Sequence, residues 1–363
     1  MAYGWGDSIR NLATGYFASV MATGIVSIAL FLKGVRELSA IWFLIAIGLY
    51  VLMIGAYLLR LVLFPQEVWR DLTSANKVFG YFTFIAGTDV LGTRFTLSGI
   101  YSVAMGLGIA ALVSWLVLTY FILTFLLFYN TQPVEKVING SWLVITVSCE
   151  SLAALGSALA DYLPHQHTGL LFVAYAFWSL GIILYLIFIA LIMHRFFFYP
   201  MTASDLSPPY WINMGAMAIT TLAGSRLVLY PHATTFLLSV RPFVQGFTIM
   251  LWVWGTWWIP FLVLIGIWKY FVYKERFAYE PNLWSMVFPL GMYTAACETM
   301  SSINGLHFVH ILVSGELWTA VTAWIVVAIS FLVQLFGKKG RLLVSNTCIR
   351  RADLGGTTRQ GRS

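Results

Sequence analysis

Charged residues are scarce in this chain. Asp, Glu, Lys and Arg make up only 10% of its 363 residues, while 60% of the residues are hydrophobic. A soluble domain has about 25% charged residues, so this chain has too few to cover a water-exposed surface. The mean hydropathy of +0.83 agrees with that conclusion. The composition therefore predicts a polytopic membrane protein.

Two other features that the sequence lacks restrict the kind of membrane protein further. Only three cysteines occur, two within apolar segments and one in the basic C-terminal stretch, which does not indicate a disulfide framework. The N-terminus lacks the pattern of a cleaved signal peptide, so none is expected. Aromatic residues are abundant, at 17% with 15 Trp, as is typical of rings placed at membrane interfaces.

Long apolar runs take the place of the missing polar surface. A membrane-spanning helix needs roughly 20 mostly apolar residues. The predicted class is therefore all-α, with a cytoplasmic segment at 1–14, a transmembrane domain at 15–336 and a basic, flexible tail at 337–363. Ten spans are predicted, at 15–33, 39–64, 77–94, 101–129, 140–161, 168–198, 211–230, 243–273, 283–302 and 315–336.

Basic residues are unevenly divided between the two ends of these spans. With ten spans both termini share one side, and 16 of the 21 Lys and Arg residues border that side or follow the last span. Positive loops favour the cytoplasm, so we expect cytoplasmic termini in a plasma or inner membrane. The charge borders the membrane instead of forming a separate domain, so the expected partner is the lipid bilayer and not nucleic acid.

An aromatic residue begins each odd-numbered span, at intervals of 65, 60, 69 and 73 residues. Each interval holds two spans, so the repeating unit is a helical hairpin and all odd helices point the same way. The odd spans are rich in small and polar residues, which allow close packing and can line a water-filled path. We expect five odd helices around a central pore, with a tightly packed core as the alternative. The aromatic residues are Phe17, Phe82, Trp142, Trp211 and Trp284.

Several segments resemble one known family. PPYWINMGAMAITTLAG, GTWWIPFLVLIGIWKYF and YEPNLWSMVFPLGMYTAACETM look like the tellurite-resistance/C4-dicarboxylate transporters of the voltage-dependent anion channel superfamily. That group includes malate permeases, sulfite efflux pumps and plant slow anion channels. FASVMATGIVS and WLVITVSCESLAALGSALA also fit, so the resemblance covers residues 15 to about 336. It implies five hairpins around a pore for small anions such as malate, sulfite or tellurite, usually as a homotrimer.

In that family a Phe on the ninth helix closes the pore, and the matching residue is Phe288, which Pro289 follows. The repeat supports this separately, because the same offset from the aromatic start selects one Met and three small residues elsewhere. A single ring facing small partners would close a narrow pore by dewetting. The alternative is a core Phe beside a proline kink. The four positions on the other odd helices are Met21, Ala86, Thr146 and Gly215.

Five ionisable residues lie inside odd spans, where a charge is costly and indicates function. Asp89 and Glu150 lie roughly 10–12 Å from the aromatic starts, at 1.5 Å per residue. Removal from water favours a neutral carboxyl, so these acids would carry a proton with the anion, or else bond to hydroxyls between helices. Arg94, Arg226 and Glu298 lie roughly 18–23 Å in, as an outer vestibule for an anion or as a structural ion pair.

Other kinds of function find little support in the sequence. The histidine pairs lack nearby Cys or acidic ligands, so no metal or cofactor is predicted. An integral membrane enzyme would show clustered catalytic motifs, which are absent from the sequence, and a sensor would have to act through the short basic tail. The prediction is therefore a channel or transporter for small anions, with a proton-coupled carrier that uses Asp89 or Glu150 as the alternative.

Overall fold

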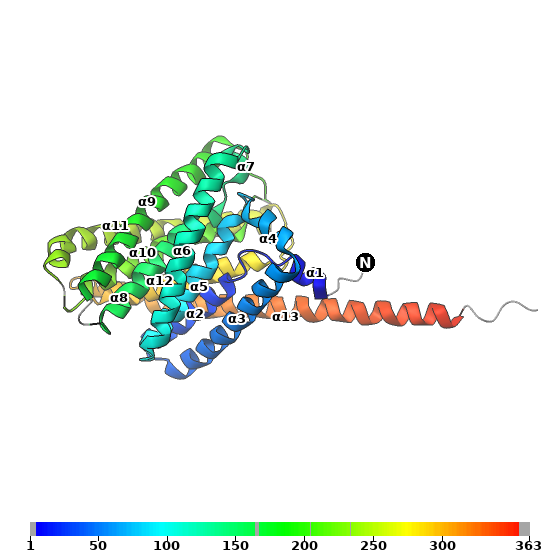
Figure 1. The fold of residues 1–363 in the computed structure, drawn as a ribbon, viewed down its shortest axis with the longest axis horizontal. Coiled ribbons are helices and arrows are strands. Elements are labelled where there is room, and N and C mark those ends of the chain that lie inside the picture. The colour runs from blue at the N-terminus through cyan, green and yellow to red at the C-terminus, as the bar shows by residue number, and fades with distance from the viewer. Residues whose placement is uncertain (1–4, 164–166, 204, 233, 356–363) are drawn as a thin grey trace, which may run out of the picture.

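The computed structural model describes residues 5–163, 167–203, 205–232 and 234–355 (Figure 1). These residues form helices and connecting turns, and no strand occurs among them. The predicted all-helical class is confirmed. Three short helices, α1 (Trp5–Arg10), α4 (Pro65–Leu72) and α7 (Val134–Val137), lie outside the long ones.

Five helices form an inner ring. Each packs against the next one along the chain, and the last packs against the first, which closes the ring. Their residues are almost all buried, because small side chains let neighbouring backbones approach. The ring helices are α2 (Ala18–Leu32), α5 (Phe82–Leu97), α8 (Val144–Ala160), α10 (Ile212–Leu229) and α12 (Trp284–Ser301).

Each ring helix is followed by a long helix that packs on its outer side. In these outer helices only 17–39% of the most apolar stretch is buried, against 89% in α8 and α10. Large apolar side chains such as Leu127 and Ile311 are exposed there, as expected of a surface that faces lipid. The outer helices are α3 (Arg36–Leu63), α6 (Tyr101–Tyr129), α9 (His167–Phe198), α11 (Thr235–Ile267, extended by a π-helical turn at Trp268–Val272) and α13 (His310–Gly355).

Short 3₁₀ turns lead into four of the ring helices. Consecutive turns along the chain contact one another, so the N-terminal ends of the ring helices gather at one end of the ring. The aromatic residue of each of these four repeats lies within its turn or directly after it, which is the structural counterpart of the aromatic repeat. The turns are η1 (Val78–Tyr81), η2 (Gly140–Leu143), η3 (Pro208–Trp211) and η5 (Pro281–Leu283).

Each of the ten apolar segments predicted from the sequence contains a helix. Among the described residues, seven helices are long and apolar enough to cross a membrane, and α2 is a shorter apolar helix. The ten crossings therefore stay a prediction. The backbone of α13 continues to Gly355 and leaves the bundle on the side where the N-terminus lies (Figure 1), so a helix occupies part of the predicted flexible tail. Residues 356–363 lie outside the described residues.

Substitution of Gly140 tests whether the turns η2 and η3 need their close backbone contact. A Cβ atom at this position would lie 2.5 Å from the backbone nitrogen of Tyr210 and would overlap Pro209. Backbone atoms cannot rotate aside, so we expect Gly140→Ala to destabilise the protein by about 1–3 kcal/mol. Thermal unfolding of the detergent-solubilised protein, followed by size-exclusion chromatography, measures this loss.

Gly106→Ala is the matched control, since Gly106 is exposed on α6 and a Cβ there meets nothing within 4 Å. Alanine is the better helix former, so this variant should match the parent or exceed it by about 0.5–1 kcal/mol. A Gly140→Ala protein as stable as the parent would show that the turns do not need their close contact.

Candidate functional site

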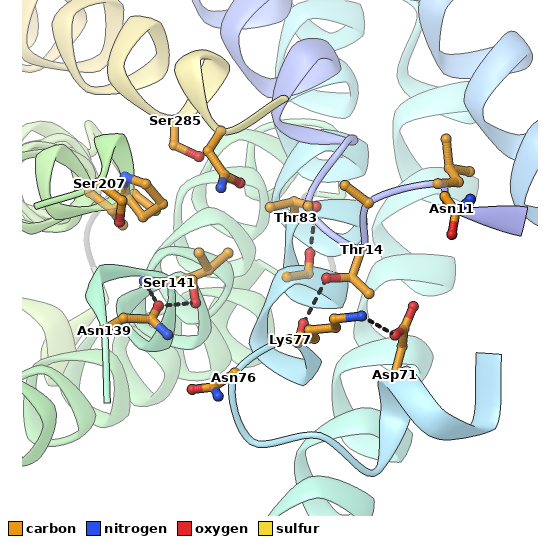
Figure 2. A pocket seen from close by; sticks show the side chains of 18 of the residues that line it. Asn11, Thr14, Asp71, Asn76, Lys77, Thr83, Asn139, Ser141, Ser207 and Ser285 are labelled. Carbon is orange, nitrogen blue, oxygen red and sulfur yellow. Dashed lines mark hydrogen bonds and ion pairs between the residues drawn. The ribbon is translucent and has the colours of Figure 1, made fainter. Parts of the chain in front are cut away.

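A cavity of about 500 Å³ opens where the N-terminal ends of the ring helices meet. Each of the five ring segments, meaning a ring helix with the residues that lead into it, contributes to the cavity wall through residues at or just before the start of its helix. Figure 2 shows hydroxyl groups of different elements around this opening, among them Ser141, Ser207 and Ser285. The equivalent wall positions on the five helices are Gly15, Gly80, Ser141, Pro209 and Asn282.

Basic side chains outnumber acidic ones in this cavity, which we call the basic cavity. Six Lys and Arg residues and three acids line it. The N-termini of five aligned ring helices add partial positive charge at the same place. The combination favours an anion. The lining cations are Arg10, Arg60, Arg70, Lys77, Lys136 and Arg195, and the acids are Glu67, Asp71 and Asp205.

Ion pairs fix the cations in position around the opening. Arg60 and Asp71 are both buried, with Nη2 and Oδ2 2.6 Å apart, and Lys77 Nζ lies 2.9 Å from Asp71 Oδ1. Glu67 pairs with Arg70 and accepts two hydrogen bonds from Arg10, at 3.0 and 2.7 Å. These pairs tie α1, α3 and α4 together, so the rim is an ordered structure and not a set of free side chains.

A second, very small cavity lies inside the ring. We call it the chamber; its volume is about 10 Å³, enough for about one water molecule. Only two of its lining residues, Thr93 and Ser151, have polar side chains. The chamber is lined by Ile25 and Ile28 of α2, Val90 and Thr93 of α5, Ser151 and Ala154 of α8, Ile219 and Leu222 of α10, and Met292 of α12.

The residues that line the two cavities are separated by the same number of positions in all five ring segments, and we call this common spacing the register. The chamber residue on each lies ten positions after the equivalent wall residue of the basic cavity, as Ser151 follows Ser141 and Met292 follows Asn282. On four helices the register repeats at seven residues, from Thr83 to Val90 for example, which is two turns on one face. The same face of each ring helix therefore turns toward the axis of the ring.

Phe288 falls on this face, between the two cavities. It lies three residues after Ser285 of the basic cavity and four before Met292 of the chamber, and it is fully buried. At the same level a Cβ at Gly215 would lie 2.7 Å from Cγ of Pro289, so α10 and α12 approach closely there. The register places Met21, Ala86, Val147, Gly215 and Phe288 at this level.

Val147 takes the place predicted for Thr146. In η2, the turn before α8, the wall residue Ser141 directly precedes the aromatic residue Trp142, whereas Gly80 and Pro209 stand two residues before theirs. The aromatic residue is thus offset by one position in this repeat, so counting from it selects Thr146 and the spacing of the two cavities selects Val147. Thr146 is buried, and no hydrogen-bond partner of its Oγ1 occurs among the described residues.

The two buried acids have different surroundings. Asp89 is fully buried, and its Oδ2 accepts a 2.7 Å hydrogen bond from Ser151 of the chamber. Glu150 points away from the chamber, because a Cβ at Gly181 on α9 would overlap its carboxylate. Neither Glu150 oxygen has a hydrogen-bond partner within the described parts of the chain. Only Asp89 therefore touches a residue that lines the axis.

Arg94 is held between three helices. Its guanidinium donates to Ser27 on α2 at 2.9 Å, to Ser39 on α3 at 3.1 Å and to Ser98 at 2.6 Å. It also lies 4.7 Å and 4.6 Å from the ring centroids of Phe31 and Phe43. These contacts use its donors within the protein, as in a structural crosslink.

Arg226 and Glu298 occupy separate places, so the predicted outer trio is not brought together. Arg226 follows Ile219 by seven residues, on the axial face, and lines a pocket of about 290 Å³ with Asp161. Its Nη1 donates to the carbonyl of Ala154 at 3.1 Å. Glu298 instead pairs with His310, at 3.1 Å from Nδ1. Arg226 lines its pocket from the axial face, whereas the guanidinium of Arg94 is turned toward serines of α2 and α3.

The basic cavity was not predicted from the sequence, where the Lys and Arg residues served only to assign which side of the membrane the termini occupy. Its residues come from helices and loops spread between positions 10 and 285, so no local motif joins them. The usable signal was the position two residues before most aromatic starts, which lines the cavity. No cluster of three His, Cys, Asp or Glu residues able to hold a metal occurs in the ranges that the structure describes.

Comparison with known proteins gives consistent matches. Residues 11–332 match the model of a family described as voltage-dependent anion channel. An "uncharacterized transporter" of Methanocaldococcus jannaschii is 24% identical over 343 residues, which cover 90% of this chain and 96% of that protein. The sulfite efflux pump of Trichophyton rubrum is 24% identical over 323 residues, covering 81% and 82%. An "uncharacterized membrane protein" of Mycobacterium tuberculosis is 37% identical over 164 residues, covering 45% and 83%.

The pH dependence of stability tests whether the ion pairs of Glu67 stabilise the wall of the basic cavity. Hydrogen bonds from Arg10, with a smaller contribution from Arg70, hold the pKa of its carboxyl below the ordinary value of 4.5. A lowered folded-state pKa means that Glu67 stabilises the fold above about pH 4.5 and loses this effect as the pH falls through the folded-state pKa. The thermal midpoint of Glu67→Gln should therefore lie below that of the parent at pH 7, and the gap should close on acidification.

Glu135→Gln on α7 is the control, since no ion pair of Glu135 occurs among the described residues. It should differ little from the parent at any pH. A gap for Glu67→Gln that persists or widens as the pH falls toward 3.5 would contradict the role of the Arg10 pair.

Proposed function

The chain belongs to the voltage-dependent anion channel family, and we propose that it conducts small anions through the membrane along the axis of its helix ring. The observation that carries this proposal is the common register of the basic cavity and the chamber on all five ring segments. A shared axial face on five helices is what a conduit needs, and a packed core needs no such repeat. The pathway would run from the basic cavity past Phe288 and the chamber to Arg226.

Charge along this pathway supports anions as the cargo. The basic cavity carries more cations than acids at its wall, and Arg226 stands at the far end of the same face. A cleft of one charge sign raises the local concentration of the opposite ion. Both ends of the pathway would thus attract anions, and the apolar middle would hold them only weakly, which lets them leave.

The proposed gate is Phe288, together with Pro289, the next residue on α12. The gate level holds one large aromatic side chain against Met21, two small aliphatic residues and Gly215. An aromatic ring among such partners excludes water from a narrow passage. The proline removes one helical hydrogen bond next to the ring and so favours a local change of backbone.

The proposed substrates are a small oxyanion such as sulfite or tellurite, or a C4-dicarboxylate such as malate. A relative that the chain covers at 82% is a sulfite efflux pump, which favours sulfite among them. A proton-coupled carrier of the same anions is the second candidate. The observation in its favour is the position of Asp89, which is fully buried and one hydrogen bond away from the chamber; the bond itself, to Ser151, is of the kind that the sequence offered as the structural alternative. We assign no catalytic activity.

We further propose ten membrane crossings with cytoplasmic termini, in a plasma or inner membrane. The basic cavity lies at the ring end near α1, and a cationic rim is favoured on the cytoplasmic side. The short ring helices α2 and α5 would cross with the help of the turns that precede them. A homotrimer with one pathway per protomer rests on family resemblance.

Phe288→Ala should open the pathway. We expect anion flux into proteoliposomes to rise on the order of tenfold, which corresponds to a barrier lower by about 1.4 kcal/mol. Flux of chloride, nitrate, sulfite and malate would be measured separately, so that the same experiment ranks the substrates.

Phe82→Ala is the matched control. Phe82 is equally buried and stacks on Phe79, but it lies one residue away from the axial position Thr83. This variant should lose stability without gaining flux. Equal gains in both variants, or a folded Phe288→Ala protein with unchanged flux, would rule out the gate.

Arg226→Gln should weaken the preference for anions. Loss of the axial charge at the end pocket should lower the permeability ratio of chloride to potassium by about tenfold, by analogy with charge focusing in clefts. Reversal potentials across a planar bilayer, recorded in the Phe288→Ala protein, measure this ratio.

Arg94→Gln serves as the comparison, because the donors of Arg94 are bound to three serines, on α2, on α3 and after α5. It should lower the thermal midpoint and leave the permeability ratio of the folded protein unchanged. If Arg94→Gln changed the ratio and Arg226→Gln did not, the axial assignment of Arg226 would be wrong.

A further inference from the structure

The chamber offers few hydrogen bonds to an anion. Of its nine lining residues only Thr93 and Ser151 have hydroxyl groups, and the others are apolar. An anion that leaves water for such a place needs donors to replace those of the solvent. The direction of the Ser151 proton therefore matters for any anion that passes.

In this structure the Ser151 proton is already engaged in hydrogen bonds within the protein. Ser151 Oγ lies 2.7 Å from Asp89 Oδ2 and 2.9 Å from the carbonyl of Ser148, and its single proton is shared between these two acceptors. Asp89 is fully buried, and its second oxygen, Oδ1, has no hydrogen-bond partner among the described residues. An ionised carboxylate can only accept, so beside it the Ser151 hydroxyl turns its proton away from the chamber.

A proton on Asp89 reverses this arrangement. A protonated carboxyl has one donor of its own and donates it to Ser151 Oγ. Ser151 then no longer donates to Asp89, and its proton keeps only the neutral Ser148 carbonyl as an acceptor, for which an anion in the chamber competes. We propose that Ser151 is an anion subsite that is switched on by protonation of Asp89, with one proton bound for each donor released. This inference rests on the proposed anion pathway and deepens it.

The other groups near Asp89 do not supply a competing switch. On α8, Glu150 points toward α9 and Cys149 is a buried free thiol. On α3, the Tyr50 hydroxyl lies 3.2 Å from Thr88 Oγ1. The spans of α2 and α6, which also pack on α5, contain no acidic or basic residue. Arg94, further along α5, is bound to serines.

The test uses anions that stay ionised, nitrate and chloride, in proteoliposomes between pH 8 and pH 5. The Phe288→Ala protein serves as background, so that the chamber is accessible. Flux should rise about tenfold toward pH 5, the effect of one hydrogen bond to a charged group. Asp89→Asn should give the high flux at every pH, because its amide donates to Ser151 as the protonated acid would. Ser151→Ala should give low, pH-independent flux, and Ser151→Thr should restore the pH response.

Glu150→Gln is the matched control, since it neutralises a second buried acid that does not touch the chamber. It should keep the pH response of the background. The inference is overturned if Asp89→Asn keeps that response, or if Glu150→Gln abolishes it. A background protein that conducts equally at all pH values would overturn only this inference. A background protein without anion flux at any pH would overturn the proposed function as well.

Discussion

Close packing between neighbouring ring helices is the constraint on which the cavities depend. Glycines permit it at four of the five contacts: a Cβ at Gly24 would lie 2.8 Å from Val90, at Gly92 2.9 Å from Leu155, at Gly215 2.7 Å from Pro289, and at Gly291 2.9 Å from Ile25. Helices that approach this closely cannot slide or rotate without overlap. The same face of every helix is thereby held toward the axis, and the chamber and the level of Phe288 follow from that register.

The distribution of charge distinguishes the two ends of the axial face from its middle. Cations gather in the basic cavity at the N-terminal ends of the ring helices, where the helix dipoles reinforce them. The middle of the axial face is nearly apolar, and Asp89 reaches it only through Ser151. On the proposed pathway an anion is thus attracted at the ends and meets a narrow region in which single hydrogen bonds decide passage. Arg94 and Glu298 stabilise contacts outside this path.

Sequence periodicity predicted the helices and much of the axial face, because one hairpin repeats five times and aromatic residues mark each repeat. Counting from these residues selected Met21, Ala86, Gly215 and Phe288, which also share the sequence spacing of the two cavities, and selected Thr146 where that spacing selects Val147, because Trp142 is offset by one residue. That these side chains line a pore stays a prediction. Depth alone could not separate Arg226 from Arg94, since the direction of a side chain depends on neighbouring helices. The basic cavity was missed because tertiary packing, not sequence proximity, assembles its rim.

The central claim is that one face of each ring helix lines a continuous pathway, and cysteine labelling along α10 tests it most directly. Cys149, Cys297 and Cys348 would be replaced, and single cysteines introduced in the Phe288→Ala protein at Ile212, Ile219 and Leu222, which line the two cavities. Two further cysteines would be placed at Met217, which faces α11, and at Thr221, one helical turn further along the same face. A small anionic thiol reagent should label the first three and block flux, and should leave the other two unlabelled. Labelling of positions 217 and 221, with 212, 219 and 222 protected, would contradict the account.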